Sequence, residues 1–218
     1  MRGNIQSAIQ QAIDGAPERG FVESVEMAFT IRDVDLKIPT NRIQEEIRLP
    51  SGRGKPIRIA MFAGGEMATK ARAAGIDVID PSTIEDLGGN RQKARKTAGQ
   101  YDFFLSEIPH MGTVGRHLGA VLGPRGKMPR PVPPTLEPGN IATGLKDTAI
   151  VRSRDRVTFH TAVGSREQGI DDLTSNAVAV WERVTGKLER GAGNIRSCYV
   201  KTSMGPSVKV EVIGCKIG

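Results

Sequence analysis

The chain is 218 residues long, which is enough for one large domain or two small ones. Its 31 Lys and Arg residues outnumber its 24 Asp and Glu residues and give a net charge of +7, which favours a polyanionic partner, above all nucleic acid. No apolar run approaches the roughly 20 residues of a membrane-spanning helix, and the first residues lack a signal-peptide core. We therefore expect a soluble, cytoplasmic protein with no membrane partner.

The amino-terminal region predicts a helix followed by a strand. In residues 4–14, apolar side chains recur at helical spacing until Gly15 and Pro17 end the run. In residues 24–31, apolar side chains alternate with mostly polar ones. This alternation predicts a sheet with one face in the core and the other open to solvent or to a ligand.

The pattern changes after residues 49–56, where two glycines and two prolines predict a hinge. Three nearly continuous apolar runs follow, at residues 57–63, 76–80 and 101–107, with helix-like stretches between them. Such alternation favours a small α/β domain with a parallel sheet that is covered on both faces. One helix-like stretch, residues 90–99, carries four basic side chains, which is more typical of a solvated face than of a dedicated site.

The open-faced pattern returns from about residue 155. The elements predicted there are a strand at 156–163, a helix at 170–188, and strands at 195–204 and 207–214. The two ends of the chain therefore resemble each other more than either resembles the middle. The simplest account is a discontinuous domain of residues 1–53 plus 154–218, with residues 54–153 inserted as a second domain.

The cysteines and histidines do not predict a metal site. Cys198 and Cys215 are the only cysteines, neither stands at metal-ligand spacing, and both are expected to be reduced thiols. His110, His117 and His160 are scattered. We expect neither a metal nor a cofactor, and no catalytic set of nucleophile and base stands out.

Residues 119–131, GAVLGPRGKMPRP, raise the possibility of a nucleotide-binding loop, but they fail its pattern. A Walker loop needs a glycine five positions before its second glycine and a Ser or Thr after its lysine. Here Val121 occupies the first position, and Met128 follows Lys127. The segment 62–68, FAGGEMA, also lacks the spaced glycines of a dinucleotide site.

The same residues form a basic, turn-rich segment that we interpret as a loop. Arg125, Lys127 and Arg130 lie in a stretch without acidic residues between Glu107 and Glu137. Such a loop tolerates the close approach of phosphates. Composition leaves two interpretations open: a secondary basic contact to RNA, or a shaped connection whose charges are solvated.

Three segments carry a resemblance to a known family. LGPRGKMPRP (122–131), YVKTSMGPSVKV (199–210) and RGFVESVEMAF (19–29) resemble motifs of the L-one family of large-subunit ribosomal proteins, in its archaeal form. The resemblance implies a split α+β terminal domain with an antiparallel sheet and an inserted Rossmann-like α/β domain. It also implies four partners: the large ribosomal subunit, its 23S rRNA, exit-site tRNA and the chain's own mRNA, whose translation it represses.

The resemblance places the main RNA surface on the terminal domain. The matching positions are Phe21, Glu26, His160, Ser165, Arg166, Ser197, Thr202, Ser203, Met204 and Gly205. Strand parity puts Ser197 and Ser203 on one face, where hydroxyls can bind ribose 2′-hydroxyls. Where bacterial relatives carry a lysine the chain has Ser165, and Arg166 is expected to supply the charge. Gly205 is expected to let the backbone approach RNA.

Three functions remain to be compared. The first is a noncatalytic component of the large ribosomal subunit that binds rRNA and represses its own translation. The second is a nucleotide-dependent enzyme that uses the inserted domain, and the missing nucleotide motifs argue against it. The third is a general basic nucleic-acid-binding module, whose signature is a steep salt dependence without preference for one RNA.

Overall fold

The computed structural model describes residues 1–212. The chain forms two compact units: Met1–Lys55 with Asp147–Gly218, here called the terminal unit, and Pro56–Lys146, here called the inserted unit. One antiparallel and one parallel sheet, each with helices, confirm the predicted mixture of α+β and α/β folds. The sequence placed the second boundary after residue 153, but the strand just before it pairs with a strand of the terminal unit.

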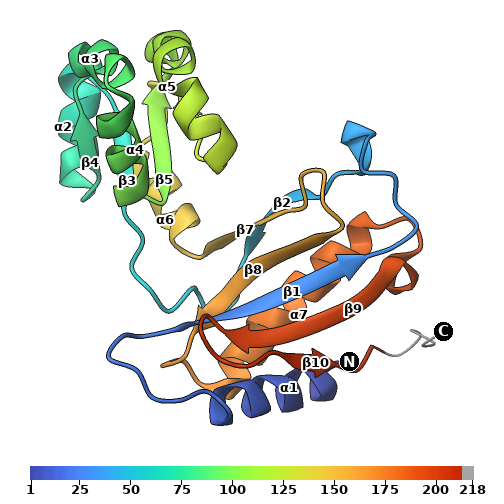
Figure 1. Ribbon diagram of the computed structural model, residues 1–218. Coiled ribbons are helices and arrows are strands. Elements are labelled where there is room, and N and C mark those ends of the chain that lie inside the picture. The colour runs from blue at the N-terminus through green and yellow to red at the C-terminus, as the bar shows by residue number, and fades with distance from the viewer. Residues whose placement is uncertain (213–218) are drawn as a thin grey trace. The chain divides into compact units, whose positions relative to one another are not determined.

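The terminal unit is built on a four-stranded antiparallel sheet in the order β10-β9-β1-β8 (Figure 1). Its strands are β1 (Ser24–Ile31), β8 (Thr158–Ser165), β9 (Ile195–Thr202) and β10 (Val208–Val210). The other elements are β2 (Gln44–Arg48) paired with β7 (Thr148–Arg152), the helices α1 (Arg2–Asp14) and α7 (Ile170–Lys187), and the short 3-10 turns η1 (Pro39–Asn41) and η4 (Gly191–Asn194). The helices α1 and α7 contact each other and pack on one face of the sheet.

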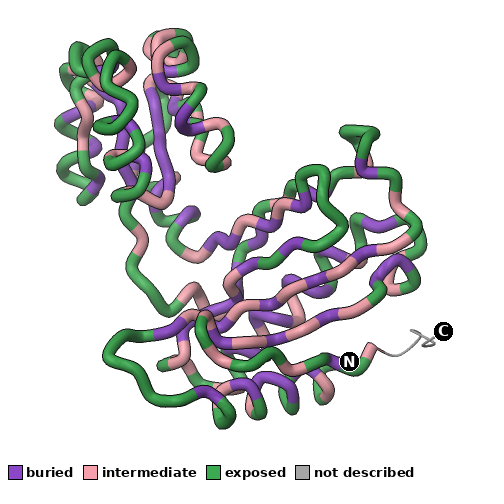
Figure 2. Tube along the Cα trace, viewed as in Figure 1, coloured by how far each residue is buried: buried purple, intermediate pink, exposed green. Residues whose placement is uncertain are grey.

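Burial alternates along the strands, as the sequence predicted (Figure 2). On the core side the Phe29 ring of β1 stacks on Phe159 of β8, with centroids 5.4 Å apart, and lies 6.1 Å from Trp181 of α7. The other side, here called the open face, is at least partly exposed. It comprises Ser24, Glu26, Ala28, Thr30, Thr158, His160, Ala162, Ser197, Tyr199, Lys201, Ser203 and Lys209.

The inserted unit contains a four-stranded parallel sheet in the order β4-β3-β5-β6. Its strands are β3 (Ile59–Phe62), β4 (Asp77–Ile79), β5 (Phe103–Glu107) and β6 (Arg130–Val132). Its helices are α2 (Gly65–Ala73), α3 (Ile84–Gly89), α4 (Arg91–Gln100), α5 (Met111–Arg125) and α6 (Pro138–Lys146), with 3-10 turns η2 (Pro81–Thr83) and η3 (Ile108–His110). Helices α3, α4 and α5 form one cluster with Phe62 and Phe104, whereas α2 packs against α6.

The prediction of a loop at residues 119–131 is wrong for its first half. Helix α5 continues through Arg125 and ends at Gly126, whose φ of 70° gives the left-handed conformation that glycine adopts without cost. Val121 and Leu122 are buried at helical spacing with Leu118. Their burial outweighs the Gly-Pro signal, and the helix continues past Pro124, although this residue has no N–H to donate to the preceding turn.

Candidate nucleic-acid interface

Three rows of side chains cross the open face from β8 through β1 to β9. The rows are Ala162–Glu26–Lys201, His160–Ala28–Tyr199 and Thr158–Thr30–Ser197. Lys209 of β10 pairs with Tyr199 and lengthens the middle row. Hydroxyls, cations and an aromatic ring dominate this surface, and such groups bind ribose, phosphate and bases. Its chemistry fits a nucleic acid better than an apolar partner.

A buried carboxylate organises one end of this face. Glu23, which precedes β1, is only 1 % exposed. Its Oε1 accepts a hydrogen bond from the Met204 backbone N–H at 2.8 Å and lies 3.8 Å from Arg19 Nε, while its Oε2 lies 3.4 Å from a guanidinium nitrogen of Arg166. We call Glu23, Arg19, Arg166 and Met204 the Glu23 cluster. It ties three segments, those before β1, after β8 and after β9, into one structure.

The hydrogen bonds of the Arg166 guanidinium are made to other groups of the protein. Besides Glu23, its guanidinium donates to the carbonyl oxygens of Pro17 at 2.9 Å, Ala16 at 3.0 Å and Ile13 at 3.4 Å. These carbonyls lie in the last turn of α1 and just after it, where a cation also interacts favourably with the helix dipole. Arg166 therefore holds the segment after α1 against the sheet, and few of its donors remain for a phosphate.

Substitution of Arg166 by Gln is therefore expected to weaken RNA binding without changing its salt dependence. A lost phosphate contact lowers the slope of log affinity against log salt by about one, whereas lost positioning lowers affinity at every salt concentration alike. Binding titrations between low and moderate salt measure both quantities. A slope reduced by a full unit at unchanged protein stability would instead identify Arg166 as a phosphate ligand.

Ser203 lies beside Glu26 on the open face. Its hydroxyl can donate to Glu26 Oε1 or to the Ser24 carbonyl oxygen, both 3.3 Å away, and its backbone N–H donates to the same carbonyl at 3.0 Å. Lys55 Nζ donates to the Val22 carbonyl oxygen at 2.7 Å and to the Ser24 hydroxyl at 3.0 Å. The Ser203 hydroxyl is thus fixed in direction, with its lone pairs left to accept from a ligand.

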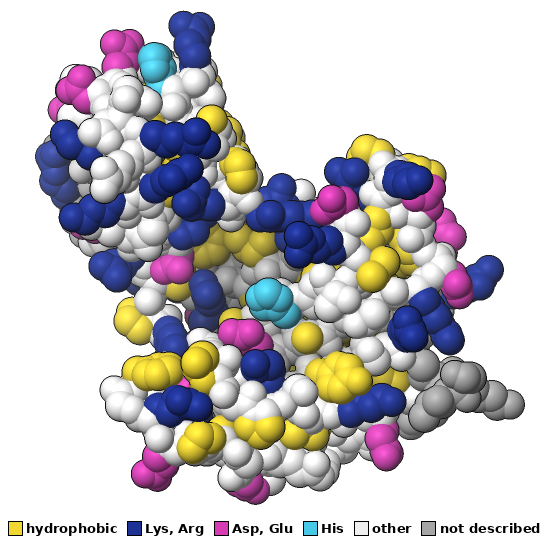
Figure 3. Space-filling view, viewed as in Figure 1, with side chains coloured by type: hydrophobic (Ala, Val, Ile, Leu, Met, Phe, Trp, Pro, Cys, Tyr) yellow, Lys and Arg dark blue, Asp and Glu magenta, His cyan; other side chains and the backbone are white. Residues whose placement is uncertain are grey.

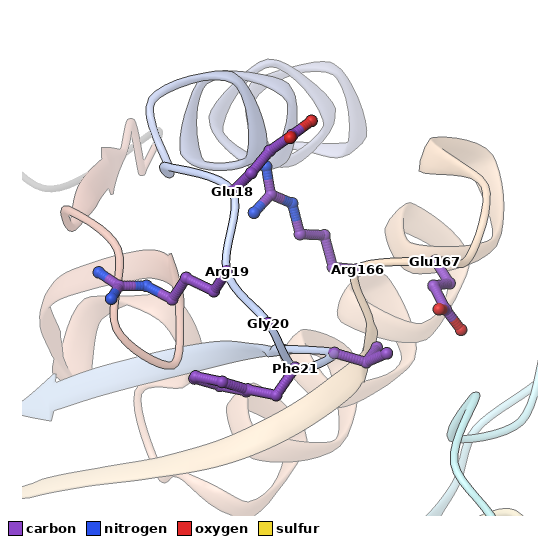
Figure 4. A pocket seen from close by; sticks show the side chains of 7 residues that line it. Glu18, Arg19, Gly20, Phe21, Arg166 and Glu167 are labelled. Carbon is purple, nitrogen blue, oxygen red and sulfur yellow. The ribbon is translucent and has the colours of Figure 1, made fainter.

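Two large apolar side chains stand exposed at the same end. Phe21 is 56 % exposed and Met204 is 62 % exposed. Phe21 lines a cavity of about 570 Å³ together with Glu18, Arg19, Gly20, Val22, Arg166 and Glu167 (Figure 4). Exposed apolar side chains among polar groups are typical of a binding surface, and an aromatic ring there can stack on a base.

Thr202 lies at this end of the sheet on its core side, opposite Val25, whereas Ser165 pairs with Ser24 of the open face. Both side chains are 0 % exposed, and neither hydroxyl has a hydrogen-bond partner among residues 1–212. Neither hydroxyl is accessible to a ligand in this structure. Gly205 is required by the protein itself, because a Cβ there would collide with Thr202 Oγ1 and lie 3.0 Å from the Ala16 Cβ.

His160 and Ser197 occupy other parts of the open face. His160 is exposed in the middle row, opposite Ala28. Ser197 pairs with Thr30, six residues before Ser203, which corresponds to about 20 Å along a strand. The structure therefore brings Phe21, Glu26 and residues 203–205 together, with His160 along the same face and Ser197 at its far end.

The three cations of the predicted secondary contact all interact within the inserted unit. Lys127 Nζ donates to the carbonyl oxygens of Ala98 at 2.9 Å and Tyr101 at 2.6 Å, and burial lowers its pKa. Arg125 donates to the Val121 carbonyl oxygen at 3.1 Å, and the Arg130 guanidinium lies 5.4 Å from the Phe103 ring centroid. These interactions favour the structural interpretation of the motif over a phosphate contact.

The start of α2 is occupied by a carboxylate rather than prepared for a phosphate. In α/β folds, phosphates bind backbone N–H groups at such a position after a strand. Here the Gly64 N–H donates to Glu107 Oε1 at 3.0 Å, and Glu107 Oε2 lies 3.7 Å from His110 Nε2. A phosphate would meet a negative charge there, which argues further against the nucleotide-dependent enzyme.

Sequence reasoning missed several residues of the interface. Glu23 and Arg19 carry the cluster described above, and no pattern signals that a glutamate before a strand is buried. Strand parity places Tyr199 and Lys201 on the same face as Ser197 and Ser203, and Lys209 of β10 lies beside them, but none of the three was predicted as an RNA contact.

The described residues contain no group of three or more His, Cys, Asp or Glu placed to hold a metal ion. Within residues 1–212, no helix is long and apolar enough to cross a membrane. Burial raises the pKa of the Cys198 thiol to about 12, so this thiol is unreactive at neutral pH. Cys215 lies outside the described residues.

Comparison with known proteins agrees with the motifs. Residues 10–206 match the model of the "Ribosomal protein L1p/L10e family". The chain is 47 % identical over 211 residues to the large ribosomal subunit protein uL1 of Methanothrix thermoacetophila, covering 96 % of this chain and 100 % of the relative. It is 45 % identical over 213 residues to uL1 of Pyrococcus horikoshii (96 % of each chain) and 44 % identical over 208 residues to uL1 of Thermoplasma acidophilum (95 % and 96 %). These are archaeal ribosomal proteins rather than enzymes, and the chain accordingly belongs to the ribosomal protein L1p/L10e family.

Proposed function

We propose that this chain is a cytoplasmic, noncatalytic component of the large ribosomal subunit that binds 23S rRNA through the open face. The observation that carries the proposal is the grouping of exposed Phe21 and Met204 around Ser203 and Glu26 at one end of that face. The names of its relatives support the assignment to the large subunit. The family resemblance supports two further roles, release of exit-site tRNA and repression of its own mRNA through a similar RNA structure.

The chemistry of this end suits a folded RNA. Phe21 offers an aromatic face to an unstacked base, and Met204 can pack on a base or ribose. The oriented Ser203 hydroxyl and the Glu26 carboxylate can accept from 2′-hydroxyls or base amines. Lys201, next to Glu26 in the same row, supplies positive charge for the phosphates.

Removal of Phe21 or Met204 should therefore weaken RNA binding while leaving the protein stable. For Phe21→Ala we expect roughly a tenfold loss of affinity, at the lower end of the range for an aromatic stack on a base. Because both side chains are exposed, the thermal unfolding midpoint should stay at its wild-type value. Filter binding to a 23S rRNA fragment measures the affinity.

The matched control is Ile38→Ala, since Ile38 is also a large exposed apolar residue of the terminal unit, at 48 %. It should bind as the wild type does. If Phe21→Ala and Met204→Ala also bind as the wild type, the assigned surface is wrong. If the wild type binds unrelated RNA hairpins as well as the 23S fragment, the general basic module becomes the better description.

A further inference from the structure

Helix α4 of the inserted unit presents an exposed surface of positive charge only. Its four charged residues are Arg91, Lys93, Arg95 and Lys96, and all four are exposed. None of them forms an ion pair with a carboxylate among residues 1–212. The buried side of the helix consists of Ala94 and Ala98, which pack into the core cluster. The whole outward arc of α4 is thus basic or neutral, and Figure 3 shows many Lys and Arg side chains over this unit.

These charges do not stabilise the helix that carries them. Arg91 and Lys93 lie in its first turn, at the positive end of the helix dipole, and no acidic residue accompanies them there. Arg91 and Arg95 are also like charges four residues apart, which repel each other on one face. A bound anion would relieve both effects, so the charge pattern is suited to a ligand rather than to the isolated fold.

The family's signature motif stabilises the carboxyl end of α4 and does not compete with this helix for a ligand. Lys127 donates to the carbonyl oxygens of Ala98 and Tyr101. These carbonyls lie at the carboxyl end of α4, where the helix itself provides no N–H partners. Lys127 is committed to this end of α4, and Arg125 is the one exposed cation of the motif. Helix α4 carries four exposed cations, so positive charge for an external polyanion lies mainly on α4.

We propose that the outward face of α4 is a second binding surface of this chain, for the phosphate backbone of RNA. This inference rests on the proposed function, since it takes the partner to be an RNA. The surface contributes affinity and salt dependence without reading sequence, because lysine and arginine on an exposed helix meet phosphates rather than base edges. Ribosomal RNA and tRNA share this chemistry and are distinguished by the experiment.

The test uses the full-length double variant Arg95→Gln/Lys96→Gln, in which glutamine preserves helix propensity. The control is Arg72→Gln/Lys146→Gln, which removes the same charge from exposed positions on α2 and α6, outside the α4 cluster. Affinity is measured against salt with a 23S rRNA fragment and with deacylated tRNA. We expect the α4 variant to lose about one unit of slope for each phosphate contact removed, and the control to lose less.

Each outcome either supports or overturns the assignment of α4 as a phosphate-binding surface. A reduced slope with the 23S fragment assigns α4 to rRNA, and a reduced slope with tRNA alone assigns it to tRNA. The proposal is overturned if the α4 variant and the control have equal salt slopes with both RNAs and Arg91→Gln/Lys93→Gln also matches the control. This comparison requires that all variants keep the wild-type unfolding midpoint. Failure of the proposed function is a separate result, because it appears in the wild type as a lack of preference for the 23S fragment.

Discussion

Glu23→Ala is expected to lower the free energy of unfolding by about 2 kcal/mol and to weaken binding to 23S rRNA as well. The substitution removes the acceptor of the Met204 N–H and the counter-charge of Arg166 and Arg19. With that carboxylate gone, the segment after β9 loses its shortest hydrogen bond to the segment before β1 and keeps the weaker one from Arg19 to the Met204 carbonyl oxygen. Urea unfolding measures the first effect, and a binding titration at fixed salt measures the second.

Two variants distinguish the effect of losing the buried carboxylate from the effect of losing a negative charge in general. Glu167→Ala removes an exposed glutamate from the same cavity and should change neither stability nor affinity beyond the small effect of one surface charge. Glu23→Gln keeps an oxygen for the Met204 N–H but loses the charge, so it should fall between the wild type and Glu23→Ala. Wild-type stability of Glu23→Ala would show that the cluster is dispensable.

Gly205→Ala is expected to cost about 1–3 kcal/mol of stability, as overpacked substitutions do, and to displace Met204 and Ser203 from the interface. The added methyl would collide with Thr202 Oγ1, on a buried and branched side chain that cannot turn away. The glycine is needed for space within the protein, whereas the sequence suggested space for RNA. Thermal unfolding and RNA binding should therefore fall together.

A double variant tests this explanation directly. Thr202→Ala removes the colliding hydroxyl, so the Thr202→Ala/Gly205→Ala pair should be less destabilised than the sum of its single variants. Rescue should be incomplete, because the Ala16 Cβ remains 3.0 Å from the new methyl. Gly20→Ala is the control, since a Cβ at Gly20 meets nothing within 4 Å. Strict additivity of the two single effects would refute the proposed collision.

Much of the architecture could be predicted because it follows from short-range periodicity. Alternation in residues 24–31 predicted a strand with one buried face, and the same logic placed Ser197 and Ser203 together on the open face. Residues 119–131 were misread because glycine and proline were given more weight than Leu118, Val121 and Leu122, whose burial depends on tertiary packing. The Glu23 cluster could not be predicted, since its members lie up to 185 residues apart.

The position of β1 between β8 and β9 has a consequence for synthesis of the protein. Both partners of β1 lie more than a hundred residues downstream, so β1 has no neighbours while the middle of the chain is being made. The inserted unit is continuous in sequence, and we expect it to fold first on the ribosome. The open face is completed only when β9 and β10 have emerged, so we expect the proposed RNA binding to be restricted to chains whose translation has passed β10.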